Sequence, residues 1–201
     1  MFIVFEGLDG SGKTTQIQRL ADRLAAAGQS CHITCQPSGH PVGQLIRRAL
    51  RGDFAVENET MALLFAADRC QHLAAEITPT LARGTYVLCD RYYYSSLAYQ
   101  GKSAAVYNKQ AMTHHRPDLT LFLDVDPAEC MRRITAARAG VDLYEREDKL
   151  TQSRTRFLAI FEQLKQTDRV VVIDANADED TVADRIWQCI ESARSVHDNP
   201  Q

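Results

Sequence analysis

The sequence predicts an α/β protein in which helices cover both faces of a parallel β-sheet, within one domain spanning residues 1–201. Two observations support this fold class. Several short apolar runs are rich in β-branched and aromatic residues, and they are continuous rather than alternating, as is typical of buried parallel strands. Helical patterns lie between these runs, so strand and helix alternate along the chain.

The predicted elements follow from local signals. Strong strand candidates are residues 2–6, 86–89, 119–125 and 169–175, and residues 30–35 are a weaker candidate. Helical patterns cover residues 14–27, 59–84, 126–140 and about 180–196. Gly28 provides the first stop signal, Pro79 is expected to interrupt the second helix, and Asp126 is the expected N-cap of the third.

Composition narrows the class of protein. The net charge of −3 gives no sign of a nucleic-acid-binding surface, and no apolar run approaches the roughly 20 residues that span a bilayer. The first seven residues lack the basic region of a signal peptide. The six cysteines form no CxxC pair, which favours reduced thiols in a cytoplasmic protein over a structural zinc site.

A phosphate-binding loop follows the first predicted strand and opens the first predicted helix. Residues 7–14 match the pattern GxxxxGK[ST]. Glycines let successive N–H groups turn inward around an anion, and the helix N-terminus adds unpaired donors. Lys13 is expected to reach the β- and γ-phosphates, and the Thr14 hydroxyl to ligate Mg²⁺. The expected nucleotide-binding residues are Gly7, Asp9, Gly10, Ser11, Gly12, Lys13, Thr14 and Thr15.

A second polar site is predicted where the strand over residues 86–89 ends. Ligands of open α/β sheets bind at the carboxyl ends of strands. Asp90 is expected there to hold Mg²⁺, directly or through water. Arg91 would lie beside the transferred phosphate, where a planar cation stabilises spread negative charge. The tyrosines at 92–94 are open to a packing role and are assigned no catalysis.

Four segments, in this order, resemble the thymidylate kinases, which make dTDP from dTMP. They are FEGLDGSGKTTQ, LLFAADR, CDRYYYSSLAYQG and RPDLTLFLDVDP. The resemblance implies the three-layer fold of the P-loop kinases, with a five-stranded parallel sheet and a short lid. It also implies ATP and dTMP as substrates, Mg²⁺ as cofactor, and a homodimer.

The resemblance assigns the acceptor residues by position. Phe65 resembles the ring that stacks on thymine, and Arg69 the group that contacts the base edge. The two are four residues apart, and therefore lie on one face of a helix. Ser96, Tyr99 and Gln100 resemble residues that hold the base and restrict the sugar, with Tyr99 near the deoxyribose 2′ position.

One segment departs from the family pattern. Many bacterial members carry TREPGGT where this chain reads TCQPSGH. Pro37 is kept as a substrate-binding residue, but Cys35 and Gln36 replace the arginine and glutamate. That arginine would be expected to grip the acceptor phosphate, so either Arg47 or Arg48 is a candidate to compensate. A different acceptor, or weak activity, is the alternative explanation.

The remaining catalytic assignments lie in the loop and the lid. Asp9 resembles an acidic residue near the sugar 3′-hydroxyl and the bound phosphates. The charged segment 138–152 is the expected lid. The phosphate-binding loop has no basic residue between Gly7 and Gly12, so a lid arginine is expected to close over the γ-phosphate. The candidates are Arg133, Arg138 and Arg146, of which Arg138 is preferred.

Together these residues predict in-line transfer of a phosphoryl group from ATP to dTMP, with Asp9, Lys13, Arg91 and Arg138 as the catalytic residues. Two alternatives remain open. The first is a kinase of the same fold that acts on another nucleotide or a deoxynucleoside. The second is a nucleotide-binding regulatory protein without phosphotransfer activity.

Overall fold

The protein is built on a parallel sheet with the strand order β2-β3-β1-β4-β5. The computed structural model describes residues 1–137 and 147–197, and within them the sheet has five strands. The strands are β1 (Phe2–Gly7), β2 (Cys31–Cys35), β3 (Tyr86–Asp90), β4 (Leu119–Asp124) and β5 (Val170–Asp174). All five predicted strands, including the weaker candidate, are confirmed.

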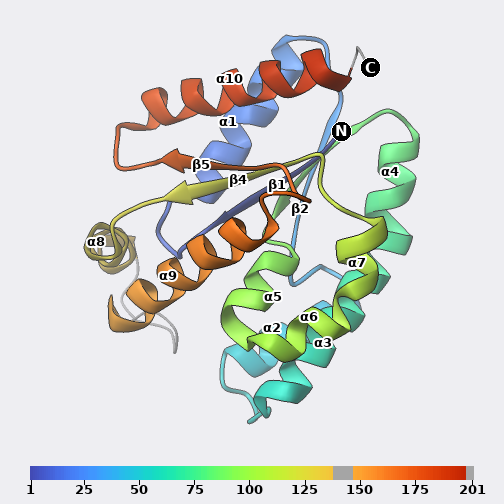
Figure 1. Cartoon of the computed structure of the whole chain (residues 1–201), viewed down its shortest axis with the longest axis vertical. Coiled ribbons are helices and arrows are strands. Elements are labelled where there is room, and N and C mark those ends of the chain that lie inside the picture. Colours follow the sequence, from blue (N-terminus) through green and yellow to red (C-terminus); the bar gives the residue numbers. More distant parts are fainter. Residues whose placement is uncertain (138–146, 198–201) are drawn as a thin grey trace.

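Helices cover both faces of the sheet, as the continuous apolar runs predicted. One face carries α1 (Lys13–Ala26) and α10 (Glu179–His197), and the other carries α5 (Tyr93–Gln100) and α9 (Glu147–Leu164) (Figure 1). Along β1, Ile3 and Phe5 pack in the first core, and Phe2 and Val4 in the second. Successive strand residues point to opposite faces, so an unbroken apolar run fills both cores.

The remaining helices flank the sheet, and the single helix predicted over residues 59–84 is divided into consecutive elements. They are α2 (Pro41–Leu50), α3 (Asn58–His72), the π-helical turn η1 (Leu73–Ile77), α4 (Thr78–Ala82), α6 (Lys102–Tyr107), α7 (Lys109–His114) and α8 (Pro127–Ala137). The predicted interruption at Pro79 is misplaced. The chain leaves α-helical geometry at Leu73, and Pro79 lies in the first turn of α4, where a missing N–H is tolerated.

The predicted lid overlaps a helix. Residues 147–152 form the first turns of α9, a helix for which no prediction was made. Residues 138–146, with the candidates Arg138 and Arg146, lie outside the described residues. Among the described residues, every helix is too short or too polar to span a lipid bilayer.

The topology brings two predicted sites together. Strands β1 and β3 are adjacent, with Phe5 paired to Asp90. The phosphate-binding loop follows β1, and Arg91 follows β3, so both leave the sheet at the same edge. Neighbouring carboxyl ends of parallel strands are where open α/β sheets bind ligands.

Candidate active site

The phosphate-binding loop joins β1 to α1 through backbone conformations that favour glycine. Gly10 and Gly12 have φ angles of 78° and 89°. A Cβ atom at Gly10 would lie 2.6 Å from the carbonyl oxygen of Cys130, so this turn also passes close to α8. The glycines of the motif therefore meet a conformational and, at Gly10, a steric requirement.

Lys13 folds back over the loop. Its Nζ donates hydrogen bonds to the carbonyl oxygens of Gly7, at 3.0 Å, and Leu8, at 2.9 Å. An ammonium group has three N–H donors, so one remains beyond these two bonds. Burial, followed by the charge of Arg91, lowers the pKa of Lys13. A bound anion would reverse this unfavourable environment, as expected for a phosphate-binding lysine.

A cavity of about 810 Å³ surrounds the loop, and we name it the donor cavity. Seven of the eight predicted nucleotide-binding residues line it, and Gly7 lies beneath it as a partner of Lys13. Thr14 and Asp90, the predicted metal ligands, line the same cavity. Helix α8 adds Arg132 and Arg133, both paired with Glu129.

The donor cavity fits a magnesium ion held mainly by phosphate and water. The buried Oδ1 of Asp90 has no hydrogen-bond partner among the described residues, and the same holds for the Ser11 hydroxyl. The described ranges contain no group of three or more metal-binding side chains. Mg²⁺ commonly uses one or two carboxylates together with nucleotide phosphates, so a single orphaned carboxylate oxygen suits it.

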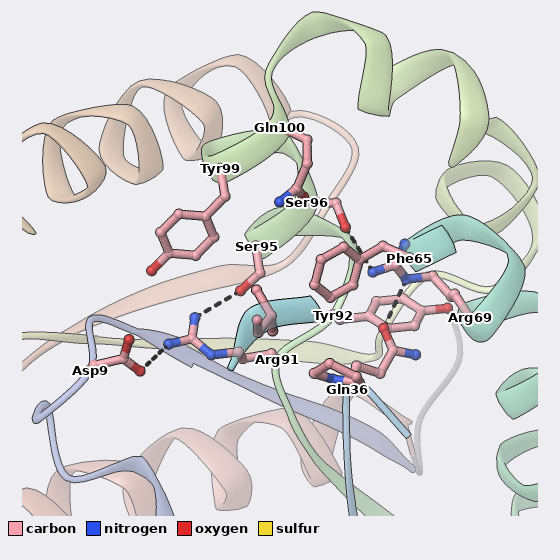
Figure 2. Close-up of a pocket in the computed structure, with 12 residues that line it drawn as sticks. Asp9, Gln36, Phe65, Arg69, Arg91, Tyr92, Ser95, Ser96, Tyr99 and Gln100 are labelled. Carbon is pink, nitrogen blue, oxygen red and sulfur yellow. Dashed lines mark hydrogen bonds and ion pairs between the residues drawn. The ribbon is translucent and has the colours of Figure 1, made fainter. Parts of the chain in front are cut away.

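A second, smaller cavity of about 190 Å³ lies beside the first, and we name it the acceptor cavity (Figure 2). All seven predicted substrate-binding residues line it: Pro37, Phe65, Arg69, Arg91, Ser96, Tyr99 and Gln100. They come from the loop after β2, from α3 and from the segment after β3. Its size and its aromatic walls suit one flat ring with a few polar contacts.

Arg69 lies at one end of the acceptor cavity with only 1% of its surface exposed. Its Nε donates to the Gln36 Oε1 at 2.9 Å, and one terminal nitrogen donates to the Ser96 Oγ at 3.1 Å (Figure 2). The other terminal nitrogen donates to the Asn108 Oδ1. Burial lowers the pKa of Arg69. The three side chains that accept hydrogen bonds from Arg69 are all neutral. The guanidinium therefore presents its positive charge to a ligand at this end of the acceptor cavity.

Arg91 and Asp9 line both cavities. The guanidinium of Arg91 donates to the Asp9 Oδ1 at 2.7 Å and to the Ser95 Oγ at 3.0 Å (Figure 2). Its Cζ lies 5.6 Å from the centre of the Tyr99 ring. A cation shared by two neighbouring cavities is suited to stabilise a group that passes from one to the other.

Sequence reasoning missed several residues of the acceptor cavity. Gln36, Leu50, Tyr92 and Ser95 line it as well. Ser95 and Tyr92 lie within the segment that was singled out, so their position beside Arg91 was the available signal. Asn108, which contacts Arg69 from beyond α6, had no local signal in the sequence.

Arg47 contacts the segment that departs from the family pattern. The Sγ of Cys35 accepts a hydrogen bond from Arg47 at 3.2 Å, and Arg47 also donates to the carbonyl oxygens of Pro37 and, at 2.7 Å, Ser38. Arg48 instead pairs with a surface carboxylate, that of Asp53. Of the two candidates, Arg47 is therefore the one that contacts the loop of the acceptor cavity.

Comparison with known proteins agrees with this geometry. A family model described as thymidylate kinase matches residues 5–186. A thymidylate kinase of Thermomicrobium roseum is 40% identical over 94% of this chain and 93% of its own length. One from Rhodopseudomonas palustris is 41% identical over 94% and 87%, and one from Solidesulfovibrio magneticus is 38% identical over 93% and 97%. On this evidence, the chain belongs to the thymidylate kinase family.

Proposed function

We propose that the protein transfers the γ-phosphoryl group of ATP to the phosphate of dTMP, giving ADP and dTDP. The observation that carries the proposal is the pair of adjoining cavities that share Arg91 and Asp9. One cavity contains a phosphate-binding loop, and the other has the size and lining of a site for a pyrimidine. Membership of the family supports both substrates.

The donor cavity is proposed to bind ATP through the backbone N–H groups of the loop and through Lys13. Thr14 and Asp90 are the residues that would hold Mg²⁺. The ion, when bound, would neutralise charge on the donor phosphates. Lys13 keeps one donor beyond its two carbonyl contacts, and this donor is available for a phosphate oxygen.

The acceptor cavity is proposed to select the base by its hydrogen-bonding edge. A guanidinium can donate but cannot accept, so Arg69 favours a ring with a carbonyl oxygen at this edge over one with an amino group. Phe65 lies beside Arg69 and provides a surface for ring stacking (Figure 2). This chemistry favours thymine and uracil over cytosine. Tyr99 is proposed to lie near the deoxyribose 2′ position, where a ribose hydroxyl would be crowded.

The chemical step requires positioning and charge, but no general base. A dTMP phosphate oxygen is already anionic. It attacks the γ-phosphorus in line, and as that bond forms, the bond from the γ-phosphorus to the β,γ-bridging oxygen breaks and ADP leaves. Arg91 and Lys13 stabilise the charge on the transferred group, and Asp9 orients Arg91. Arg138 stays a prediction for the cation that closes over the donor.

Arg47 is proposed to replace the arginine that the acceptor loop lacks. Its guanidinium contacts the backbone of that loop beside Cys35. It does not line the acceptor cavity in the described structure, so it would serve the acceptor phosphate by a small movement of α2 or of its own side chain. Arg47→Ala is expected to raise the KM for dTMP, and Arg48→Ala is the matched control.

A coupled assay of ADP release tests the proposed function. The acceptors to compare are dTMP, dUMP, CMP, AMP and thymidine, each with ATP and Mg²⁺. We expect dTMP to give the highest kcat/KM. Release of ADP with dTMP no faster than with CMP or AMP would show the acceptor to be wrong. Turnover of thymidine but not dTMP would identify a nucleoside kinase, and ATP binding without turnover of any acceptor would identify a regulatory protein.

We also propose that the protein is a cytoplasmic homodimer. The dimer is what the resemblance to the thymidylate kinases implies. The six cysteines, all free thiols in the described structure, are compatible with a reducing compartment. Light scattering of the purified protein should give twice the mass of the 22.5 kDa chain.

A further inference from the structure

Glu6 is a carboxylate buried at the end of β1, directly before the phosphate-binding loop. None of its surface is exposed. Its Oε1 accepts hydrogen bonds from the backbone N–H groups of Tyr92, at 2.9 Å, and Ser95, at 3.1 Å. Its Oε2 accepts a hydrogen bond from the Ser95 hydroxyl at 2.7 Å. A buried carboxylate is costly unless its oxygens are paired, and here both oxygens are.

The residues bound by Glu6 follow directly on an unusual backbone conformation at Arg91. Arg91 has a φ angle of 71°, in the left-handed region that non-glycine residues rarely adopt. Its own N–H donates to the carbonyl oxygen of Phe5 at 2.9 Å, and the next N–H, of Tyr92, donates to Glu6. Consecutive residues of β1 therefore hold the peptide groups before and after Arg91. Such strain persists only where the surroundings determine it.

The side chain of Arg91 is connected to the same carboxylate. The Ser95 Oγ accepts a hydrogen bond from Arg91 at 3.0 Å while it donates to Glu6 (Figure 2 shows the bond between Arg91 and Ser95). Ser95 therefore links the guanidinium to a fixed negative charge. Burial raises the pKa of Glu6, while the charge of Arg91 acts in the opposite direction.

We propose that Glu6 is a positioning residue for phosphoryl transfer. It holds Arg91 in its strained conformation and fixes the direction of the guanidinium at the junction of the two cavities. It does not contact either substrate. This inference rests on the proposed function for its effect on rate, but its effect on Arg91 can be measured without substrate.

Two substitutions test separately the negative charge of Glu6 and the hydrogen-bonded link from Glu6 to Arg91 through Ser95. Glu6→Gln keeps the shape of the side chain but removes its charge, and Ser95→Ala removes the link to Arg91 but keeps the carboxylate. We expect each to lower kcat with dTMP by about tenfold or more, and to change the KM for ATP by less than about threefold. The double variant should be no slower than the slower single variant, because both changes act through one chain of contacts.

Asp168 offers a matched control. It is another buried carboxylate that binds α5, and it accepts hydrogen bonds from the hydroxyl groups of Tyr93 and, at 2.8 Å, Tyr94. It has no contact with Arg91. Asp168→Asn should lower the melting temperature but leave kcat within about twofold of wild type. The position of the Arg91 side-chain N–H signal in an NMR spectrum, recorded without substrate, should move in Glu6→Gln and Ser95→Ala but not in Asp168→Asn.

The outcomes are distinct. Unchanged kcat in Glu6→Gln and Ser95→Ala, or equal losses of kcat in Asp168→Asn and Glu6→Gln, would overturn the proposal. If Glu6→Gln fails to fold, Ser95→Ala carries the test alone. A wild-type protein without dTMP-dependent turnover would overturn the proposed function, whereas an unmoved Arg91 signal in both variants would overturn the role of Glu6.

Discussion

The substitution Arg91→Lys tests whether the shape of the cation at the junction matters as well as its charge. Two terminal nitrogens of Arg91 contact two different elements, the phosphate-binding loop through Asp9 and helix α5 through Ser95. A lysine ammonium is a single nitrogen on a flexible stem, and it can keep one of these contacts while losing the other. The variant therefore keeps the positive charge but not its fixed direction.

The substitution is expected to cost more in catalytic rate than in folding stability. A lost hydrogen bond to a charged group costs about 1.5–3 kcal/mol, which corresponds to roughly 10- to 150-fold in rate. The Asp9 side chain is 43% exposed, so solvent screens its ion pair with Arg91, which contributes only about 0–1 kcal/mol to folding. A loss of that size lowers the melting temperature of a protein of this length by at most about 4 °C.

The assay is ADP release at saturating ATP and dTMP, paired with thermal unfolding of the same preparation. We expect a fall in kcat of between about 10- and 150-fold with a nearly unchanged melting temperature. The reasoning is refuted if the lysine variant keeps a third or more of the wild-type kcat. It is also refuted if the melting temperature falls so far that unfolding explains the loss of activity.

Three further predictions concern the loop, the acceptor cavity and a cluster outside the site. Gly10→Ala should weaken ATP binding and lower the melting temperature more than Gly28→Ala does, because both residues have positive φ angles but only Gly10 lacks room for a Cβ atom; equal effects would contradict the steric argument. Phe65→Ala should raise the KM for dTMP by roughly 5- to 150-fold, since stacking of a base on an aromatic ring is worth about 1–3 kcal/mol, with the KM for ATP as the internal control. The pKa of Glu76 is lowered to about 2, because hydrogen bonds from Thr34 and nearby histidines outweigh the opposite effect of burial. Its carboxylate therefore stabilises the fold above pH 4.5, the unperturbed value, and this contribution is lost as the pH falls toward 2. Glu76→Gln should flatten the acid dependence of the melting temperature in that window, and an unchanged slope would contradict the assignment.

Much of the fold was predictable because its signals are local. The run from Phe2 to Phe5 is apolar on both faces, and both faces are buried. The glycine pattern that follows it fixed the position of the phosphate-binding loop. Helix α9 was not predicted because its first turns lie in the charged segment 138–152, although Leu150, Phe157 and Phe161 are buried on one helical stripe.

The acceptor cavity was predictable by resemblance, but its supporting contacts were not. Phe65 and Arg69 share one helix face, and that spacing is visible in the sequence. The contacts of Arg69 with Gln36 and Asn108 join segments that are 33 and 39 residues away from it. Such pairs depend on how helices are placed around the sheet. Glu6 was overlooked for the same reason, since its partners lie 86 and 89 residues away.

The pair Arg91 and Asp9, shared by the two cavities, has a kinetic consequence. A phosphoryl group that crosses directly between neighbouring cavities needs both substrates on the protein at once. Asp9, the carboxylate at the crossing, is held by Arg91 and is a poor candidate for a covalent carrier. We therefore expect the reaction to proceed through a ternary complex, with initial-rate plots that intersect rather than run parallel as they do in a ping-pong scheme.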